Sequence, residues 1–213
     1  MEKCIIFCAG GFSALLEPIG QADYIIAADG GLCHTNRLGL TPNAIIGDFD
    51  SLGYIPEGAT VFPVEKDDTD AMLAVRKALA LGYREVIIYG GLDGPRLDHT
   101  LANLQALQYM ANRGVAGYLV GETHIATVIR NEKILFPANC SGILSLFCMG
   151  ADARGVTLTG LKYTLQDGTV TAGFPIGVSN HFIGKAATVA VKDGSLTLLY
   201  ERTNGIPGRE QTE

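Results

Sequence analysis

The chain has 213 residues, of which 47% are hydrophobic, and it carries a net charge of −6 at pH 7. Its hydrophobic content is enough for a sizeable core and excludes intrinsic disorder as a description of the whole chain. It has no basic cluster, so it is a poor candidate for nucleic-acid binding, which needs patches of lysine and arginine. Its apolar runs are far shorter than the ~20 residues of a membrane-spanning helix. No signal-peptide pattern follows the N-terminus, and we therefore expect a cytoplasmic protein without membrane partners.

Five cysteines are present, without any Cys-x-x-Cys pair. An odd number in this arrangement favours reduced, mostly buried thiols over disulfides or a zinc site.

Short runs rich in isoleucine and valine recur through the first 120 residues, and most end in glycine or aspartate. They are residues 4–8, 24–28, 44–46, 85–89 and 118–120, with a weaker run at 60–64. Their hydrophobicity is continuous rather than alternating, which is typical of parallel strands that are buried on both faces.

Helices are predicted between several of these runs. One covers residues 71–81 after the capping residues Asp68, Thr69 and Asp70, with Met72, Val75 and Leu79 on its apolar face. A second, which Gly114 ends, has its apolar face formed by Leu97, Leu101, Leu104 and Ala111. Residues 13–21 are predicted to form a shorter helix. Alternating strands and helices predict an α/β fold with an open, mostly parallel sheet and flanking helices.

The pattern changes after about residue 132. Short strands are expected at 143–147, 156–158, 188–191 and 196–200, with turns at 166–168 and 192–194. This spacing predicts an antiparallel β-sandwich. We expect a frayed tail from Asn204. The predicted domains are an α/β domain at residues 1–130 and a β-sandwich at residues 131–213.

Aspartate and glycine gather where the predicted strands end. Eight of the twelve aspartates lie between residues 29 and 98. In an open α/β sheet, ligands bind beyond the carboxyl ends of the strands, so Gly10-Gly11, Asp29-Gly30-Gly31, Asp48 with Asp50, and Gly90-Gly91 should share one edge.

Residues 47–51, Gly-Asp-Phe-Asp-Ser, form the sharpest motif. Asp48 and Asp50 would point to the same side of an extended chain, and a pair of neighbouring carboxylates needs a cation such as Mg²⁺. A capped turn after a buried strand explains the same residues equally well. The cluster Asp67, Asp68 and Asp70 favours the metal, because capping the helix needs only one or two of these acids.

Residues 90–100 form a glycine-rich connection from strand to helix that contains one arginine. Loop amides, the helix N-terminus and the fork of Arg96 suit a phosphate. The loop matches neither the Walker A pattern nor Gly-x-Gly-x-x-Gly. Taken alone, a flexible loop remains as good an interpretation, His99 is better explained as a capping or packing residue, and residues 177–182 are better explained as a polar turn.

Together these segments resemble the thiamine pyrophosphokinase family. The resemblance rests, in the family's order, on residues 28–31 (Ala-Asp-Gly-Gly), 46–51 (Ile-Gly-Asp-Phe-Asp-Ser), 67–70 (Asp-Asp-Thr-Asp), 90–91 with 96–103, and 177–180 (Gly-Val-Ser-Asn). It implies pyrophosphoryl transfer from ATP to the hydroxyl of thiamine, an α/β catalytic domain that binds ATP and Mg²⁺, and a β-sandwich that binds thiamine and forms a homodimer.

The resemblance also implies roles for particular residues. Asp48, Asp50 and Asp70 match the metal ligands and, with Arg96 and Asp98, the catalytic set. The ATP-binding set is Asp29, Gly30, Gly31, Gly90, Gly91 and Arg96, and the substrate-binding set is Asp98, Thr100, Ser179 and Asn180. The resemblance also implies an aromatic platform for thiamine, formed by Phe182 or a nearby side chain. The chain departs from the family in having no tryptophan.

Three alternatives remain open from the residues. A pyrophosphokinase acting on a pterin alcohol would use the same metal and ATP apparatus. A metal-dependent phosphatase would use the aspartates without ATP. A thiamine or nucleotide sensor would bind without turnover.

Overall fold

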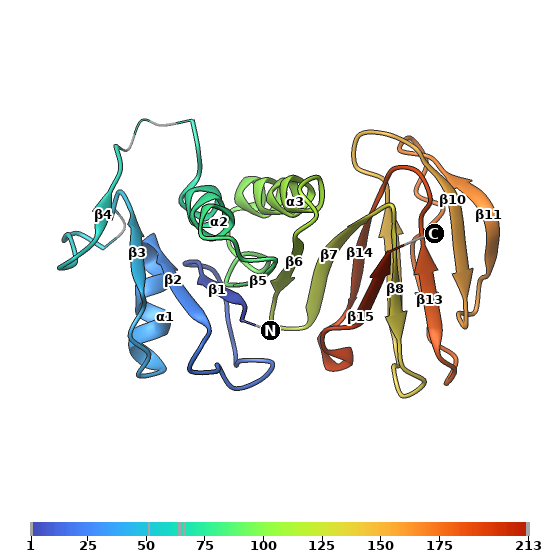
Figure 1. The fold of residues 1–213 in the computed structure, drawn as a ribbon, viewed down its shortest axis with the longest axis horizontal. Helices are drawn as coiled ribbons and strands as arrows, with labels where there is room; N and C mark the ends of the chain where they lie inside the picture. The colour runs from blue at the N-terminus through green and yellow to red at the C-terminus, as the bar shows by residue number, and fades with distance from the viewer. Residues whose placement is uncertain (1, 51, 64, 66, 212–213) are drawn as a thin grey trace. The chain divides into compact units, whose positions relative to one another are not determined.

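A computed structural model describes residues 2–50, 52–63, 65 and 67–211 of the chain (Figure 1). Ser51 of the Gly-Asp-Phe-Asp-Ser motif and Val64 of the weakest predicted strand lie outside the described residues. The chain divides into two compact units, Met1–Glu122 and Thr123–Glu213. The division lies before strand β7 (His124–Arg130), whereas the sequence placed the domain boundary after residue 130.

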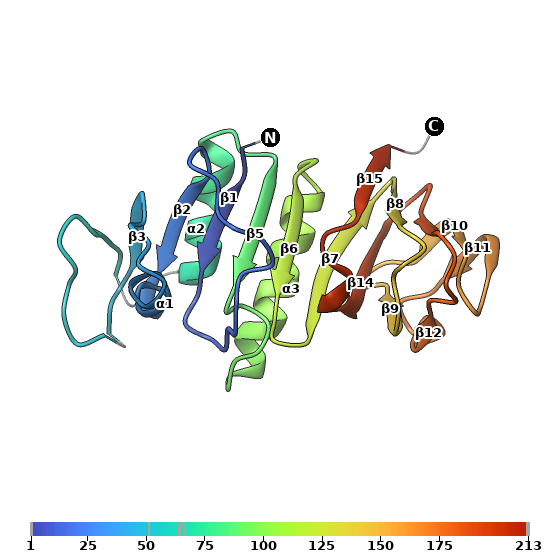
Figure 2. The same cartoon turned by 90° about the horizontal axis from the view of Figure 1, so that it is seen from below.

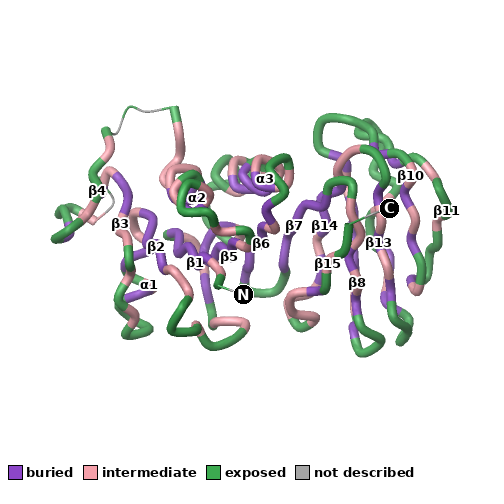
Figure 3. The backbone as a smooth tube through the Cα atoms, viewed as in Figure 1, coloured by how far each residue is buried: buried purple, intermediate pink, exposed green. Residues whose placement is uncertain are grey.

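The first unit is built on a parallel sheet. Its strands are β1 (Cys4–Phe7), β2 (Tyr24–Ala28), β3 (Ala44–Gly47), β4 (Thr60–Val61), β5 (Glu85–Tyr89) and β6 (Ala116–Val120). They lie in the order β6-β5-β1-β2-β3-β4, and every neighbouring pair is parallel. This pairing confirms the parallel sheet that the continuous apolar runs predicted. As those runs also imply, β1, β2, β5 and β6 are almost wholly buried (Figure 3).

Helices cover both faces of this sheet. The α-helices are α1 (Leu32–Arg37), α2 (Asp70–Ala80) and α3 (Leu97–Ala111), and a 3-10 turn, η1 (Asp29–Gly31), precedes α1. Figures 1 and 2 show α2 and α3 on one face and α1 on the other. Over the part of the chain that is described, none of the helices has the length and hydropathy required to span a membrane.

The helix predicted over residues 13–21 is wrong, because this segment is irregular. Pro18 lacks a backbone N–H and Gly20 is flexible, and both disfavour a helix. The segment is instead held to the sheet where the backbone N–H of Leu16 donates to the hydroxyl of Tyr89, 3.1 Å away.

The buried faces of α2 and α3 differ from those predicted. Helix α2 buries Ala71, Ala74, Val75 and Ala78, whereas Met72 and Leu79 are only half-buried. Helix α3 buries Asn103, Ala106, Leu107 and Met110, which leaves Leu97 and Leu101 exposed. Alanines allow a helix to lie close to its neighbours. The face predicted from the largest apolar side chains is therefore rotated around the helix axis from the face that is buried.

The second unit is an antiparallel sandwich, as predicted. Its remaining strands are β8 (Glu132–Phe136), β9 (Ile143–Phe147), β10 (Ala153–Thr159), β11 (Leu165–Val170), β12 (Asn180–His181), β13 (Ala187–Ala190), β14 (Ser195–Glu201) and β15 (Gly208–Gln211). One sheet has the order β12-β9-β14-β7 and the other β11-β10-β13-β8-β15. Their inner faces meet where the rings of Phe136 on β8 and Tyr200 on β14 lie 5.1 Å apart.

Two local predictions for this unit are wrong. The turn expected at residues 166–168 lies inside β11, where Asp167 has a φ of 50° beside a break in the pairing register with β10. The tail expected to fray instead forms β15, which pairs with β8. Arg209 on β15 explains this order, because its guanidinium donates to the carboxylate of Glu132 at 2.7 Å in a largely buried setting.

Candidate functional site

A cavity of about 500 Å³ opens at the carboxyl ends of the strands of the first unit. Its volume is within the range of small-molecule sites. The described residues that line it come from the loops after β1, β2, β3 and β5 and from the first turns of α2 and α3: Cys8, Ala9, Gly10, Ala28, Asp29, Asp48, Asp50, Asp68, Thr69, Asp70, Ala71, Gly90, Gly91, Gly94, Pro95, Arg96, His99, Thr100 and Asn103. The shared sheet edge expected from the sequence is therefore present.

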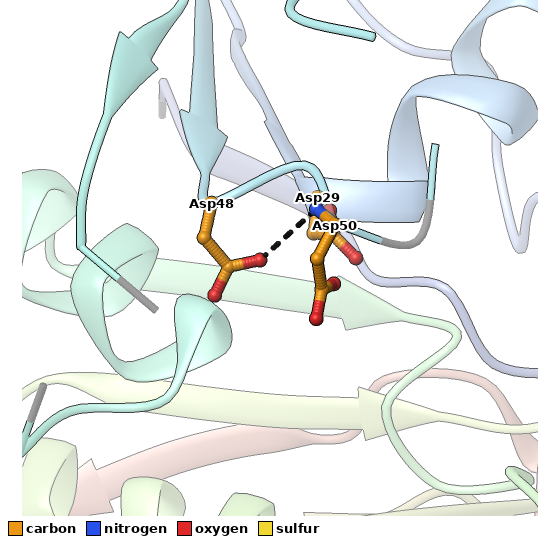
Figure 4. A group of neighbouring side chains, drawn as sticks. All are labelled: Asp29, Asp48 and Asp50. Carbon is orange, nitrogen blue, oxygen red and sulfur yellow. Dashed lines mark hydrogen bonds between the residues drawn. The ribbon is translucent and has the colours of Figure 1, made fainter. Parts of the chain in front are cut away.

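Three carboxylates meet in this cavity. Asp29, Asp48 and Asp50 each offer an oxygen within 4.8 Å of the others (Figure 4). The backbone N–H of Asp50 donates to Oδ1 of Asp48 at 3.3 Å, which fixes one carboxylate against the next residue but one. The sequence grouped Asp70 with Asp48 and Asp50 and gave Asp29 to the nucleotide. In the structure Asp29 belongs to the compact group, and Asp70 lines the same cavity from α2.

The backbone bends sharply at this group. Phe49 has a φ of 60° and Asp29 a φ of 46°, both in the left-handed region that non-glycine residues seldom adopt. Phe49 is only 2% exposed, so its buried ring anchors the turn between the two aspartates. Asp48 and Asp50 therefore converge through a left-handed turn rather than through the extended chain that the sequence interpretation assumed. Strained backbone of this kind clusters at functional sites.

The start of α2 places further acids on the cavity. Its N-cap is Thr69, whose Oγ1 accepts from the backbone N–H of Met72 at 3.2 Å. Asp68 forms an ion pair with Arg76 at 3.2 Å, and Asp70 lies in the first turn. Of the three predicted capping residues, Thr69 is therefore the one that caps the helix, and neither Asp68 nor Asp70 is the N-cap.

The glycine-rich loop after β5 lies against the loop after β1. The N–H of Gly10 donates to the carbonyl of Gly90 at 2.9 Å, and a Cβ atom on Gly10 would lie 2.5 Å from that carbonyl oxygen. Two α3 side chains hold the loop from the other side. Thr100 Oγ1 donates to the carbonyl of Leu92 at 3.1 Å, and Asn103 Nδ2 donates to that of Gly91 at 2.8 Å. This close approach needs glycine, and it leaves backbone groups facing the cavity.

Arg96 and Asp98 form a forked ion pair at the start of α3. Arg96 NH2 donates to Oδ2 of Asp98 at 2.6 Å, and Nε donates to Oδ1 at 3.3 Å. Hydrogen bonding from Arg96 holds the pKa of the Asp98 carboxyl below its ordinary value. Arg96 lines the cavity, whereas Asp98 is not among the described residues that line it. Both side chains are exposed, so the pair can exchange partners at little cost.

Cys8 lines the cavity without the properties of a nucleophile. Burial, reinforced by the charge of Asp70, raises the pKa of its thiol to about 12. Only the thiolate is nucleophilic, so Cys8 stays protonated and serves as packing at neutral pH.

Gly30 and Gly31, predicted to bind ATP, do not appear among the described lining residues. They form η1 immediately after Asp29. A Cβ atom on Gly31 would overlap the carbonyl oxygen of Phe7, so this glycine lets η1 lie against β1. In the structure, Gly30 and Gly31 therefore set the course of the backbone next to Asp29.

Ser179 and Asn180 lie in the second unit, and every described residue that lines the cavity belongs to the first. Ser179 is exposed at a φ of 60°, and its N–H donates to Oγ of Ser145 at 3.0 Å. Asn180 is 4% exposed, and its side chain accepts from the N–H of Tyr163 at 2.9 Å and donates to the carbonyl of the same residue at 2.7 Å. These contacts use Asn180 to fix the backbone at Tyr163.

The ring of Phe182 packs 5.1 Å from the ring of Phe136 and is buried. Phe182 is therefore not an open platform for a ligand, whereas Tyr163 and Phe174 are exposed aromatic side chains of the same unit.

Sequence reasoning missed His99 and Asn103 as lining residues. Their spacing offered a signal, since His99 lies three residues after Arg96 and Asn103 four residues after His99, and residues three or four apart share one face of a helix. Reading that face required knowing where α3 begins.

The chain is similar to known proteins over most of its length. The chain matches the family model "Thiamin pyrophosphokinase, catalytic domain" over residues 16–119 and the model "Thiamin pyrophosphokinase, vitamin B1 binding domain" over residues 131–196. It is 29% identical over 210 residues to a thiamine pyrophosphokinase of Bacillus subtilis, covering 92% of this chain and 98% of that protein.

Solved structures show the same fold. A thiamine pyrophosphokinase from Bacillus subtilis superposes with a TM-score of 0.82 at 24% identity, covering 94% of this chain and 99% of that one. A thiamin pyrophosphokinase family protein from Enterococcus faecalis superposes with a TM-score of 0.79 at 27% identity over 94% and 99% of the two chains. The two family models together span most of the sequence, and the chain therefore belongs to the thiamine pyrophosphokinase family, kinases that transfer pyrophosphate from ATP to thiamine.

Proposed function

We propose that this chain transfers the pyrophosphoryl group of ATP to thiamine in the acidic cavity of the first unit, with Mg²⁺ held by its aspartates. The observation that carries the proposal is the group of three carboxylates within 4.8 Å of one another, beside a glycine-rich loop that ends in Arg96. A cavity lined by five aspartates would repel the phosphates of ATP unless a cation lay between them.

The donor set fits a hard divalent cation. Carboxylate oxygens from Asp29, Asp48 and Asp50 are the ligands that Mg²⁺ prefers, and Asp70 can supply a further oxygen directly or through water. When bound, Mg²⁺ would neutralise charge on the phosphate oxygens and orient them.

The basic and backbone donors of the site would hold the phosphates. Glycines of the loop after β5 line the cavity, and α3 begins where this loop ends. Backbone N–H groups at the N-terminus of a helix favour anions. Arg96 can donate two parallel hydrogen bonds to one phosphate group. In doing so it would leave Asp98, its present partner.

Asp98 would then be available to orient the hydroxyl of thiamine. In the transfer, the hydroxyl oxygen forms a bond to the β-phosphorus, and the bond from that phosphorus to the α,β-bridging oxygen breaks. AMP leaves with the electron pair, and the hydroxyl proton passes to a carboxylate or to solvent. Because a carboxylate of low pKa is a weak base, positioning is the larger part of this role.

We place thiamine against the second unit, on the side of Ser179, and we propose a homodimer in which the aspartates of one chain face Ser179 and Asn180 of its partner. The family resemblance supports this arrangement. The exposed position of Ser179 suits direct contact with thiamine, and Asn180 would act by holding the backbone at Tyr163. We also propose that the protein works in the cytoplasm, where ATP and Mg²⁺ are supplied.

The deciding experiment measures AMP release from ATP with thiamine present and absent. We expect AMP to form only with thiamine, in step with thiamine diphosphate. AMP release with a pterin alcohol instead would identify the related pyrophosphokinase, and binding without AMP would identify a sensor. Asp48→Asn should abolish the signal, whereas Asp193→Asn, an exposed aspartate of the second unit, should leave it unchanged.

A further inference from the structure

Two side chains of helix α1 form hydrogen bonds to backbone carbonyls of the loop that follows β1. The Nε2 atom of His34 lies 2.8 Å from the carbonyl oxygen of Gly10. A carbonyl oxygen only accepts hydrogen bonds, so Nε2 must carry the proton and donate it. One turn further along the helix, Arg37 NH2 donates to the carbonyl oxygen of Phe12 at 3.0 Å.

Phe12 fills the space between these two contacts. Its ring packs edge-on against the imidazole of His34 at 5.4 Å between centroids, and the guanidinium of Arg37 lies 5.5 Å from the ring centroid. The ring is 5% exposed and also contacts Tyr89 of β5 at 5.1 Å. The loop over residues 10–12 is therefore fixed by two hydrogen bonds and a buried ring.

This loop forms one wall of the candidate ATP site. Gly10 lines the cavity and donates its N–H to Gly90 of the loop after β5. Its neighbour Gly11 donates its N–H to the carbonyl of Asp93, in the same loop after β5, at 2.6 Å. Helix α1 itself follows directly on Asp29 through η1. One short helix therefore connects a member of the carboxylate group to a loop packed against the glycine-rich phosphate loop.

We infer that His34 and Arg37 are positioning residues that hold the loop over residues 10–12, and through it the loop after β5, in the arrangement that binds the phosphates of ATP. This inference rests on the proposed function of the cavity. Neither side chain is among the described residues that line the cavity, so both would act through the backbone of Gly10 and Phe12. Preorganised loop amides bind a phosphate better than mobile ones, because the cost of ordering them has already been met by folding.

The test separates binding of ATP from binding of thiamine. His34→Leu keeps a side chain that can pack on Phe12 and removes the donor to Gly10, whereas His34→Gln restores an N–H donor at a similar reach. Asn36→Leu, at an exposed position of the same helix, is the matched control. The KM for ATP, the KM for thiamine and the melting temperature are measured for each variant. The Kd of the ATP analogue α,β-methylene-ATP is measured in the presence of Mg²⁺.

For His34→Leu we expect the KM for ATP and the Kd of the analogue to rise about three- to tenfold, the range of one lost hydrogen bond. The KM for thiamine should stay within twofold, and His34→Gln should recover most of the loss. An ATP affinity of His34→Leu equal to that of Asn36→Leu would overturn the inference, as would a thiamine KM that rises equally.

Arg37 keeps the inference testable if His34→Leu does not fold. Arg37→Leu alters an exposed side chain and removes only the contact to Phe12, so it should raise the same two ATP constants and leave the KM for thiamine unchanged. Wild-type ATP constants in a folded Arg37→Leu protein would then overturn the inference. Analogue binding also separates this inference from the proposed function, since it is measured even if the wild-type chain releases no AMP.

Discussion

Phe49 shows how one buried side chain can arrange two acidic neighbours. A left-handed backbone at a non-glycine residue costs about 1–3 kcal/mol. Burying a phenylalanine ring stabilises the folded state by about 1.5–3 kcal/mol, so burial of Phe49 can offset the cost of the turn. The buried ring and the left-handed backbone belong to the same residue, Phe49. Burial of the ring therefore holds the turn that positions Asp48 and Asp50 on either side of it.

Replacing either aspartate by asparagine should remove most of the turnover and leave the fold intact. Asp48→Asn and Asp50→Asn each withdraw a negative charge from the carboxylate group while keeping side-chain size. We expect kcat to fall by at least about 100-fold, as for loss of a major electrostatic contact to the transition state. AMP release and circular dichroism measure the two effects. Near-normal activity at low Mg²⁺ in either variant would contradict the ligand assignment.

Arg96→Lys should restore only part of the activity lost in Arg96→Met. Lysine keeps the positive charge but cannot make the forked contact that Arg96 makes with Asp98 in this structure. We therefore expect a KM for ATP between those of wild type and Arg96→Met. Wild-type kinetics in the lysine variant would show that the fork is not used on the phosphates.

The ion pair with Arg96 also predicts how Asp98 titrates. Because Arg96 lowers the pKa of Asp98, the carboxyl stays ionised to a lower pH than an ordinary aspartate. In Arg96→Met the titration midpoint should move to higher pH, so that Asp98 is protonated over a range in which the wild-type residue is charged. Carbon-13 NMR of the ATP-free protein measures the midpoint directly. An unchanged midpoint would mean that the ion pair is not populated in solution.

At the scale of elements, α2 and α3 use small residues where the sheet is close. The buried positions of α2 include three alanines, and α3 buries Asn103 so that its amide can reach the carbonyl of Gly91. The larger Leu97 and Leu101 face outwards on α3. Part of the buried face of α3 therefore makes a polar contact with the loop after β5, and a pattern of large apolar residues does not reveal that face.

Strand β15 depends on one largely buried ion pair. Arg209 donates to Glu132, to Thr127 and to the carbonyl of Val128, which joins β15 to strands β7 and β8. Arg209→Met should destabilise the second unit by about 3 kcal/mol, because the carboxylate of Glu132 would be left buried without its partner. Urea unfolding followed by circular dichroism measures the change.

The double variant Arg209→Met with Glu132→Met provides the control for this prediction. It removes both charges together and should recover much of the stability lost in Arg209→Met alone. If the double variant were as unstable as the sum of the two single variants, the ion pair would not be the cause.

At the scale of the molecule, the candidate chemistry is divided between two units. The three carboxylates and the loop after β5 belong to Met1–Glu122, whereas Ser179 belongs to Thr123–Glu213. A homodimer with two-fold symmetry would form two equivalent composite sites, each with aspartates from one chain and Ser179 from the other.

Mixing two inactive variants tests this arrangement. One chain carries Asp48→Ala with Asp50→Ala, and the other carries Ser179→Ala with Asn180→Ala. With free exchange about half of the dimers are mixed, and each mixed dimer has one intact site and one doubly damaged site. Activity should therefore recover to about a quarter of wild type.

A site built within one chain predicts no recovery, since every site in a mixed dimer would then be damaged. Because Asn180 holds the backbone at Tyr163, the second variant must first be shown to be folded by its melting temperature. If it is not folded, Ser179→Arg takes its place, which blocks the proposed thiamine side from an exposed position. Mixed dimers that form but remain inactive would contradict the shared site.

The sequence alone determined the two architectures and the edge of the sheet at which the aspartates and glycines gather. Continuous apolar runs require strands buried on both faces, and such strands are parallel, so Asp29, Asp48 and Gly90 had to follow strands at one edge. The five motif segments in order identified the family. These features depend on local composition and chain order, which a sequence displays directly.

Only the tertiary structure decided which carboxylates lie closest together at that edge. Left-handed turns at Asp29 and Phe49 bring Asp29 beside Asp48 and Asp50, and Asp70 lines the same cavity. The hydrogen bond from His34 to Gly10 could likewise not be predicted from the sequence, since it joins residues 24 positions apart and its acceptor is a backbone carbonyl. Any residue type offers the same carbonyl, so the amino-acid sequence carries no mark of that contact, and only the packing of α1 against β1 creates it.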